Sequence, residues 1–233
     1  DARETFQLNF PEAKFYLSDI KRLRTDSLEE LVAQDQLLLF SGCAPCQPFS
    51  KQRSSTTEKD SRATLLNSFA RFVRRYKPAL IFVENVPSLE GTSVFQTFVR
   101  ELRRLNYSCV FQVVKAQDYG VPQRRTRLIL IASLLGDIEF PLATHGPSAN
   151  LPYSTVWEWI GDLPPIKQGE EHPSIPNHRA AALSKLNLQR IKATPEGGSR
   201  LDWPARLVLD CHKTDHNGHT DVYGRMWKDL PAA

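Results

Sequence analysis

The stretch Leu37-Leu-Leu-Phe-Ser-Gly-Cys-Ala-Pro-Cys46-Gln-Pro-Phe-Ser50 decides the fold class of this chain and points to its chemistry. Its first half is a short apolar run that Gly42 and Pro45 bring to an end, which is typical of a buried strand in a parallel sheet. In open α/β sheets, ligands and reacting groups lie in the loops that follow the carboxyl ends of the strands. The sequence therefore places Cys46 where a nucleophile would be useful.

Strands and helices alternate on both sides of this stretch. Further buried strands are predicted over residues 79–83, 107–114 and 127–132, and apolar residues at helical spacing predict helices over residues 62–76 and 95–105. This alternation predicts a doubly wound, mostly parallel α/β sheet.

Before the opening stretch, the sequence predicts a helix over residues 2–9, a short strand over residues 14–17 and a helix that starts at the capping-box residue Ser27. After it, residues 47–61 are polar and lack any periodicity, which predicts a loop.

The composition changes near residue 135, because ten of the sixteen prolines lie beyond that point. We therefore expect a catalytic domain over residues 1–135 and a smaller, loop-rich lobe over residues 136–233. Within that lobe only residues 155–160 and 179–191 have a helical pattern.

Net charge, apolar run length and cysteine count limit the classes of protein to which the chain can belong. The net charge of +4 and the pI near 8.9 permit a nucleic-acid partner without demonstrating one. No apolar run is long enough to span a membrane, so no membrane partner is expected. The four scattered cysteines are too few for a disulfide scaffold and favour a reducing, cytoplasmic setting.

Three groups of reactive side chains follow or precede strands of the predicted sheet. Cys46 and Glu84 each follow a strand, whereas Arg125 and Arg127 precede one, so that strand should run antiparallel to bring them to the same edge. Nearby arginines favour the reactive thiolate form of a cysteine and can hold a carbonyl oxygen. A carboxylate can bind or protonate a ring nitrogen. Together these groups suit attack on an electron-poor heteroaromatic ring.

The motifs around these groups resemble those of a known family. Pro45-Cys46-Gln47, Glu84-Asn85-Val86 and Gln123-x-Arg125-x-Arg127 resemble, in this order, the signature motifs of the cytosine-C5 DNA methyltransferases, and Asp60-Ser-Arg-Ala-Thr-Leu65 resembles a further family segment. The resemblance covers essentially the whole chain, and four motifs in register are highly specific. It implies a class I S-adenosylmethionine-dependent methyltransferase fold, Rossmann-like, of the bacterial restriction–modification type.

The resemblance implies a role for each catalytic residue. Cys46 would attack C6 of cytosine, Glu84 would contact N3, Arg127 would hold O2 and Arg125 would support the site. The cytosine must leave the duplex first, as for methyltransferases in general. The loop over residues 47–61 would then close over the flipped base, with Ser50 at a phosphate.

The resemblance also implies a cofactor, S-adenosylmethionine. No metal is expected, because Cys211, His212, His216 and His219 form no strong zinc pattern. Asp19 would bind the adenine amino group of the cofactor, Ile20 would pack on the ring, and Pro45 and Leu65 would line the methionine end. The implied setting is a monomer in the bacterial cytoplasm, acting on double-stranded DNA and paired in function with a cognate restriction endonuclease.

The second lobe corresponds in the family to the target recognition region. Gly197, Gly198 and Arg200 lie in one segment that resembles it, and residues 221–225 form another. Glycines allow a backbone to approach DNA closely, and arginines are the commonest readers of guanine.

Two family motifs are missing from this sequence: the N-terminal glycine-rich cofactor loop and the later motif whose asparagine completes the cofactor pocket. We therefore expect residues 1–233 to be a fragment that is inactive alone, with unpaired strands on both sides of the missing elements.

Other readings stay open at this point. The chain could be a tRNA cytosine-C5 methyltransferase of the same structural family, which would use the same mechanism on a different substrate. It could also be a catalytically incompetent fragment that binds DNA without methylating it. Cys43-Ala-Pro-Cys46 has the spacing of a redox or zinc pair. Most arginines of the predicted helices are interpreted as a solvated face, with a role at the DNA backbone as the alternative. The tryptophans are interpreted as core of the second lobe rather than as stacking platforms.

Overall fold

The computed structural model describes residues 3–32, 36–44, 65–213 and 224–231. Contacts divide the chain into two compact units. The first unit comprises Asp1–Gln112 and Leu128–Phe140, and the second comprises Val113–Arg127 and Pro141–Ala233. The outer ends of the last two strands and the turn between them are thus counted with the second unit.

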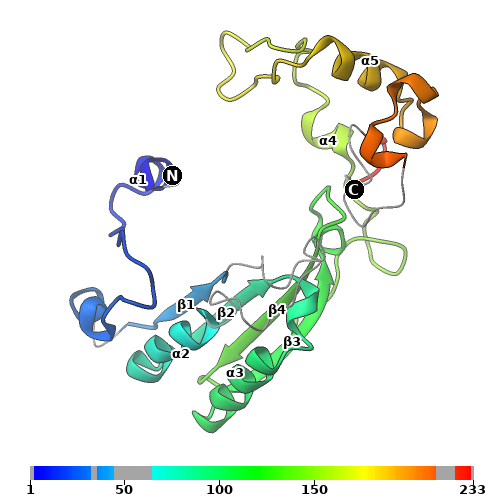
Figure 1. The fold of residues 1–233 in the computed structure, drawn as a ribbon. Helices are drawn as coiled ribbons and strands as arrows, with labels where there is room; N and C mark the ends of the chain where they lie inside the picture. Colours follow the sequence, from blue (N-terminus) through cyan, green and yellow to red (C-terminus); the bar gives the residue numbers. More distant parts are fainter. Residues whose placement is uncertain (1–2, 33–35, 45–64, 214–223, 232–233) are drawn as a thin grey trace. The chain divides into compact units, whose positions relative to one another are not determined.

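Among the described residues, the sheet has four strands in the order β1-β2-β4-β3 (Figure 1). Their bounds are Leu39–Gly42 for β1, Leu80–Asn85 for β2, Ser108–Lys115 for β3 and Thr126–Ser133 for β4. β1 runs parallel to β2, with Gly42 beside Val83. β4 runs antiparallel to β2, with Leu128 beside Asn85, which confirms the predicted strand direction.

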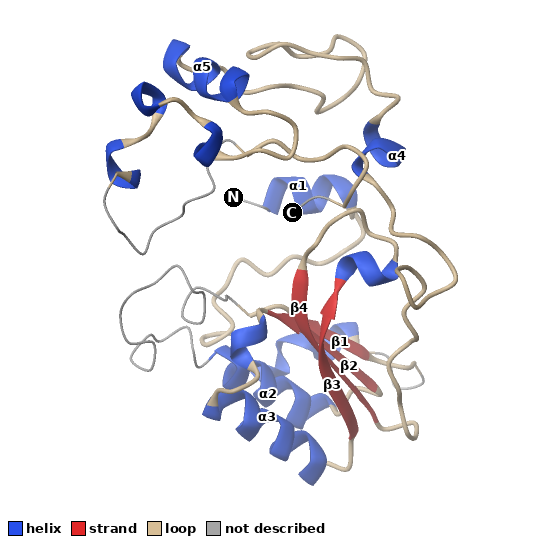
Figure 2. Ribbon diagram, turned by 90° about the vertical axis from the view of Figure 1, so that its right-hand side faces the viewer, coloured by secondary structure: helices blue, strands red, loops and turns tan. Residues whose placement is uncertain are grey.

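Two helices, α2 (Leu65–Tyr76) and α3 (Ser93–Arg104), cover one face of the sheet (Figure 2). Thr92 caps α3, because its hydroxyl accepts a hydrogen bond from the amide of Phe95. The helices bury their apolar stripes against alternate residues of the central strands, including Ile81, Val83, Leu128, Leu130 and Ala132. Each fully buried apolar side chain of this kind contributes roughly 1.5–3 kcal/mol, so this layer is the core of the first unit.

The side chains that alternate with these core residues are more open. Phe82 is 37% exposed and Leu39 is 58% exposed. This alternation follows from the two-residue period of a strand, in which successive side chains point to opposite faces.

The N-terminal segment differs from the sequence-based expectation. Helix α1 (Arg3–Asn9) forms as predicted, but the predicted strand over residues 14–17 is wrong, because these residues adopt no strand. A strand needs a neighbour whose backbone groups complete its ladder, and among the described residues this segment has none. The helix predicted from Ser27 is instead a 3-10 helix over Thr25–Leu31.

The second unit is rich in loops and has two short α-helices, α4 (Val156–Ile160) and α5 (Lys185–Ala193), within its described part. α5 begins later than predicted, because Ser184 caps it by accepting a hydrogen bond from the amide of Asn187. α4 starts with a capping box between Thr155 and Glu158.

A small buried cluster organises this second unit. The Trp203 ring is 6% exposed, and its Nε1 donates a hydrogen bond of 2.8 Å to Thr194 Oγ1. Arg190 is buried beside it and donates from Nε to the carbonyl of Leu207. The prediction that the tryptophans form core is wrong for three of them, since each of these residues is more than half exposed: Trp157, Trp159 and Trp227.

No helix among the described residues is both long enough and apolar enough to cross a bilayer. In the same part of the chain, no group of three or more His, Cys, Asp or Glu side chains could hold a metal ion.

The phenol of Tyr107 offers a test of the core. Tyr107 is buried, and its hydroxyl donates a hydrogen bond of 2.6 Å to the carbonyl of Pro78. Changing Tyr107→Phe leaves this carbonyl without its donor, so we expect the free energy of unfolding to fall by about 1–3 kcal/mol near neutral pH. Urea unfolding of the complete protein measures this loss.

The size of this loss should depend on pH. Burial raises the pKa of Tyr107 from 10.0 to about 12. The stabilisation is therefore complete below the unfolded-state pKa and is lost as pH rises from there through the folded-state pKa. We expect the difference between wild type and Tyr107→Phe to shrink above about pH 10; a constant difference across this range would contradict the assignment.

Candidate active site

The carboxyl ends of β1 and β2 place Glu84 at the sheet edge that the sequence indicated. Because Gly42 pairs with Val83 in a parallel register, the next residues, Cys43 and Glu84, also come side by side. The Cys43 thiol donates a hydrogen bond of 3.0 Å to Glu84 Oε2. Glu84 is partly buried, so its carboxylate is held in one place yet remains reachable.

Asn85, the residue after Glu84, links the ends of β1 and β2 a second time. Its side chain is 3% exposed, and Nδ2 donates a hydrogen bond of 2.9 Å to the carbonyl of Ala44. Its Oδ1 accepts from the amide of Val86 at 2.9 Å. One buried amide therefore fixes the chain after β1 and the chain after β2 to each other, two residues before Cys46.

Two predicted cofactor residues come together beside the same strand end. Ile20 and Leu65 both line a cavity of about 260 Å³, together with the end of β1 from Ser41 to Ala44. Ile20 also lines an adjoining apolar hollow of about 340 Å³ under Leu39 and Phe40. Asp19 precedes Ile20 and is exposed, and its Oδ1 accepts from the amide of Lys21 at 2.9 Å.

Arg71 on α2 holds the segment that carries Ile20. Its Nη2 donates to the carbonyl of Ile20 at 2.8 Å and to that of Leu23 at 3.2 Å. The interpretation of the helical arginines as a solvated face is therefore wrong for Arg71. It fits better for Arg74 and Arg75, which form surface ion pairs with glutamates.

The predicted arginine pair lies where β4 starts, in residues counted with the second unit. Arg127 is partly buried, and its Nη1 donates to the carbonyl of Thr126 at 2.7 Å. Arg125 is exposed, and its carbonyl accepts from the amide of Ala116 at 2.8 Å, which closes the turn between β3 and β4.

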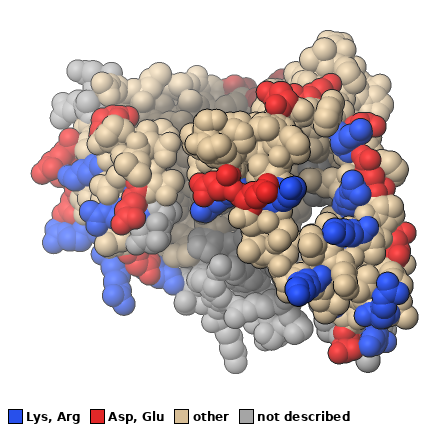
Figure 3. Space-filling view, turned by 90° about the horizontal axis from the view of Figure 1, so that it is seen from above, with Lys and Arg blue, Asp and Glu red and all other residues tan. Residues whose placement is uncertain are grey.

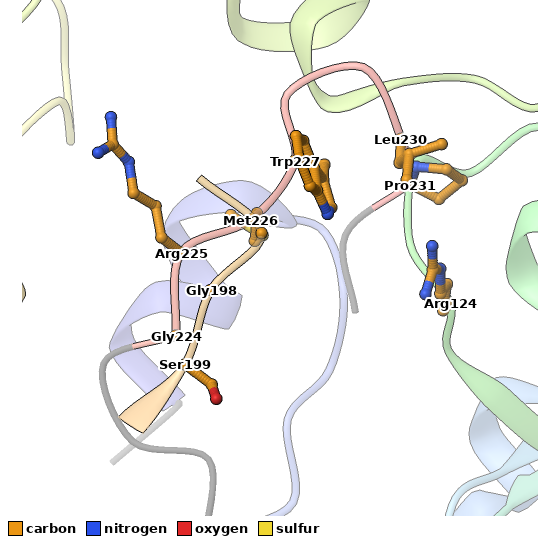
Figure 4. A pocket seen from close by; sticks show the side chains of 10 residues that line it. Arg124, Gly198, Ser199, Gly224, Arg225, Met226, Trp227, Leu230 and Pro231 are labelled. Atoms are coloured by element: carbon orange, nitrogen blue, oxygen red, sulfur yellow. The ribbon is translucent and has the colours of Figure 1, made fainter. Parts of the chain in front are cut away.

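The predicted DNA-contacting glycines line a pocket of about 610 Å³ in the second unit (Figure 4). Gly197 and Gly198 form one side of it, and the segment from Gly224 to Trp227 forms another. Arg200 begins a 3-10 helix after the Ser199 cap and is not among the residues that line this pocket.

Three predicted site residues, Pro45, Cys46 and Ser50, lie outside the described residues. Among the others, the structure brings Ile20 and Leu65 together at one cavity, and Gly197 and Gly198 line a different pocket in the second unit. Sequence reasoning missed the supporting roles of Cys43, Asn85 and Arg71. The parallel register of the two strands was the available signal for the first two, whereas nothing local to the sequence singled out Arg71.

The model of one protein family, the C-5 cytosine-specific DNA methylases, matches residues 1–200. The chain belongs to this family. Within the matched residues, Asn85 at the end of β2 donates the hydrogen bond to the carbonyl of Ala44.

Relatives within the family are bacterial type II methylases by name. M.HgiDII of Herpetosiphon aurantiacus is 35% identical over 223 residues, which cover 94% of this chain and 62% of that protein. M1.HphI of Haemophilus parahaemolyticus is 31% identical over 210 residues, covering 88% of this chain and 55% of that protein. The chain thus spans about three-fifths of the length of these relatives.

Solved structures show the same class I methyltransferase fold. The methyltransferase EhMeth of Entamoeba histolytica superposes with a TM-score of 0.60 over 84% of this chain and 56% of its own, at 21% identity. A prophage-encoded methyltransferase from Escherichia coli superposes with a TM-score of 0.55 over 72% of this chain and 47% of its own, at 26% identity.

Asn85 provides a test of how the ends of β1 and β2 are held together. Asn85→Ala removes the donor to Ala44 and the acceptor for Val86, which leaves buried polar groups unpaired. We expect the free energy of unfolding to fall by about 1–3 kcal/mol, with faster amide exchange in residues 43 and 44. The matched control is Asn67→Ala, an exposed position on α2, where a change below about 0.5 kcal/mol is expected. Equal effects of the two variants would refute the role given to Asn85.

Proposed function

We propose that this protein transfers a methyl group from S-adenosylmethionine to C5 of a flipped cytosine in a specific double-stranded DNA sequence. The observation that supports this most directly is the fixed edge at the ends of β1 and β2. There Glu84 is held by Cys43, and Asn85 anchors the chain just before Cys46. Membership of the C-5 cytosine-specific DNA methylases supplies the reaction class.

In this proposal the Cys46 thiolate attacks C6 of the cytosine and forms a carbon–sulfur bond. Glu84 contacts N3 and stabilises the enamine that results, which makes C5 nucleophilic. Bound S-adenosylmethionine supplies the methyl group to C5. The proton on C5 then leaves to a base, the electron pair re-forms the C5–C6 double bond, and Cys46 departs as thiolate.

The remaining polar residues hold the base and the DNA in the proposed complex. Arg127 donates to O2 of the cytosine, because a guanidinium offers several donors in fixed geometry, and Arg125 supports the site. Ser50 contacts a phosphate once the base has left the stack. The glycine-containing segment at Gly197, Gly198 and Arg200 contacts the recognition sequence.

The described residues fit the proposed cofactor. Ile20 and Leu65 provide apolar walls to the cavity beside the end of β1; in the proposal Ile20 packs on the adenine ring and Leu65 lines the methionine end. The Asp19 carboxylate precedes Ile20 and uses one oxygen for the amide of Lys21, so that the other can accept from the adenine amino group. Arg71 keeps this segment against α2, and Pro45 completes the methionine end in the proposal.

By analogy with relatives named as type II methylases, we place the protein in the bacterial cytoplasm as a monomer. Its functional counterpart in this proposal is a restriction endonuclease that cleaves the same DNA sequence when it lacks the methyl group.

The covalent step gives a direct test of the reaction. The complete protein, mixed with methyl-labelled S-adenosylmethionine and duplexes that contain 5-fluorocytosine, should form a denaturant-resistant protein–DNA adduct that carries the label. The fluorine cannot leave C5 as a proton does, so the intermediate is trapped. Cys46→Ser should abolish the adduct.

The matched control is Cys109→Ser. Burial raises the pKa of the Cys109 thiol to about 11, so this cysteine is unsuited to attack and its replacement should leave the adduct unchanged. Absence of any adduct across a library of DNA sequences, together with label transfer to tRNA, would assign the protein to tRNA methylation instead.

The cofactor side can be tested separately by calorimetry on the complete protein. Asp19→Ala removes a charged acceptor, so we expect the dissociation constant for S-adenosylmethionine to rise about 10- to 100-fold. Asp26→Ala is the matched control, because Asp26 is an exposed acid that pairs with Arg24 and lines neither hollow. Unchanged affinity in Asp19→Ala would remove this residue from the cofactor site.

A further inference from the structure

Another pocket of the second unit lies where β3 ends and β4 begins, and none of the described residues that line it is acidic. It has a volume of about 370 Å³, and all of its lining residues belong to the second unit. We call this cavity the β3–β4 pocket. Its polar lining consists of Lys115, Gln117, Arg124, Thr126 and Tyr153.

The two cations of the β3–β4 pocket are available to a ligand. Lys115 ends β3, Arg124 precedes β4, and both side chains are exposed. Neither side chain makes a hydrogen bond or an ion pair within the part of the chain that the structure describes. Figure 4 shows the Arg124 side chain extending toward Leu230 and Pro231, which form the apolar part of the pocket wall. Two positive charges therefore meet at one cavity without a counter-charge in its described lining.

Gln117 supplies a buried polar group to the same pocket. This residue is 9% exposed, and its carboxamide makes no hydrogen bond with another described residue. A buried amide that is left unpaired costs about 1–3 kcal/mol. A ligand oxygen that accepts a hydrogen bond from this carboxamide inside the pocket is therefore stabilised by a donor that the fold already holds in place.

The backbone that carries Gln117 is held from two sides. Gln117 lies in the 3-10 helix Ala116–Tyr119, which ends at Gly120 with a φ of +86°. A Cβ on Gly120 would lie 2.7 Å from the imidazole of His145, so that ring rests directly on the glycine. The amide of His145 also donates to the carbonyl of Asp118 at 3.0 Å. A donor on such a pre-organised segment loses less conformational freedom when it binds a ligand.

The surface around the pocket does not by itself explain an affinity for anions. Lys and Arg side chains are interspersed with Asp and Glu over the described part of the face in Figure 3. The formal net charge of the chain is only +4. General electrostatic attraction is therefore weak, and binding of an anion depends on side chains that are grouped locally.

The donors of the β3–β4 pocket fit a phosphate group better than a carboxylate. They comprise an ammonium, a guanidinium, a carboxamide and the hydroxyls of Thr126 and Tyr153, which come from two strand ends and a separate segment. A carboxylate presents its oxygens in one plane, whereas a phosphate presents oxygens in several directions. A guanidinium binds phosphate through two parallel hydrogen bonds, and an ammonium binds it as a point charge.

We propose that the β3–β4 pocket binds a phosphate group through Lys115, Arg124 and the carboxamide of Gln117. The phosphate is part of a nucleic-acid backbone or a free phosphate anion, and the same donors hold it in both cases. The inference goes beyond the proposed function, because phosphate binding at this pocket requires no S-adenosylmethionine, no flipped base and no methyl transfer.

The first arm of the test measures binding of inorganic phosphate to the complete protein by calorimetry, without DNA or cofactor. Lys115→Gln and Arg124→Gln each remove one charge-assisted hydrogen bond from an exposed position. We expect each change to raise the dissociation constant for phosphate about 10-fold or more. Gln117→Leu removes neutral donors at similar side-chain volume and should raise it about 2- to 10-fold.

The matched controls are Lys185→Gln and Arg206→Gln. Both are exposed cations of the second unit that lie outside the β3–β4 pocket, so the same loss of charge should leave phosphate affinity unchanged. Thermal unfolding of every variant checks that it is folded.

The second arm distinguishes the two sources of phosphate. Affinity for a mixed-sequence DNA duplex is measured over a range of salt concentrations for wild type and for the double variant Lys115→Gln/Arg124→Gln. With a nucleic-acid backbone as the source, the slope of log K against log salt concentration falls by about one in the double variant. With a free anion as the source, this slope equals that of wild type while affinity for inorganic phosphate is lost.

Two results would overturn the inference. The first is a wild-type protein that binds no inorganic phosphate, together with an unchanged salt slope in the double variant. The second is an equal loss of affinity in the pocket variants and in the two controls, since general electrostatics would then account for binding. Neither arm measures methyl transfer, so failure of this inference leaves the proposed function standing. A protein that methylates no DNA cytosine can likewise still bind phosphate in the first arm.

Discussion

The parallel pairing of β1 with β2, extended past the strands by two side-chain hydrogen bonds, is the constraint on which the proposed active site depends. The ladder ends at Gly42 and Val83. From there Cys43 bonds to Glu84, and Asn85 bonds to the backbone of Ala44. A loop that starts from a free strand end would sample many conformations. A buried amide instead holds the end of β1 as far as Ala44.

Helix α2 connects the core to the cofactor side. One of its faces packs Leu66, Ala70 and Val73 into the core of the first unit. Its first residue, Leu65, lines the cavity at the end of β1, and Arg71 holds the Ile20 segment from two turns further on. The same hydrophobic burial that fixes the helix therefore also fixes the distance between the two walls of the cavity.

The second unit reaches a defined geometry with little apolar core. Its order comes from the Trp203 cluster, from helix caps and from backbone hydrogen bonds that join Gly197 and Gly198 to Arg225. The ring of Trp227 packs closely on Gly197 beside them. Such a scheme leaves loops and several tryptophan faces exposed, which suits a unit whose proposed task is to contact another macromolecule.

The local pattern of the sequence determined much of the first unit. Apolar runs ended by glycine or proline located β1 and β2, helical spacing located α2 and α3, and the motif order indicated that β4 runs antiparallel to β2. These features depend on side-chain periodicity and turn chemistry, which are local properties. The same local logic predicted a strand over residues 14–17, where the missing neighbour in the described chain prevented one.

The tertiary structure alone decided which distant groups meet. Arg71 and Asn85 bond to carbonyls about 40 to 50 residues away in sequence, and the tie between Arg225 and Gly197 also joins separate segments. Sequence patterns report the burial and local conformation of a residue, but a hydrogen-bond partner across the fold follows from register and packing. For this reason the sequence identified the family and predicted its reactive residues, while the contacts that support Glu84 and Ile20 emerged only from the folded chain.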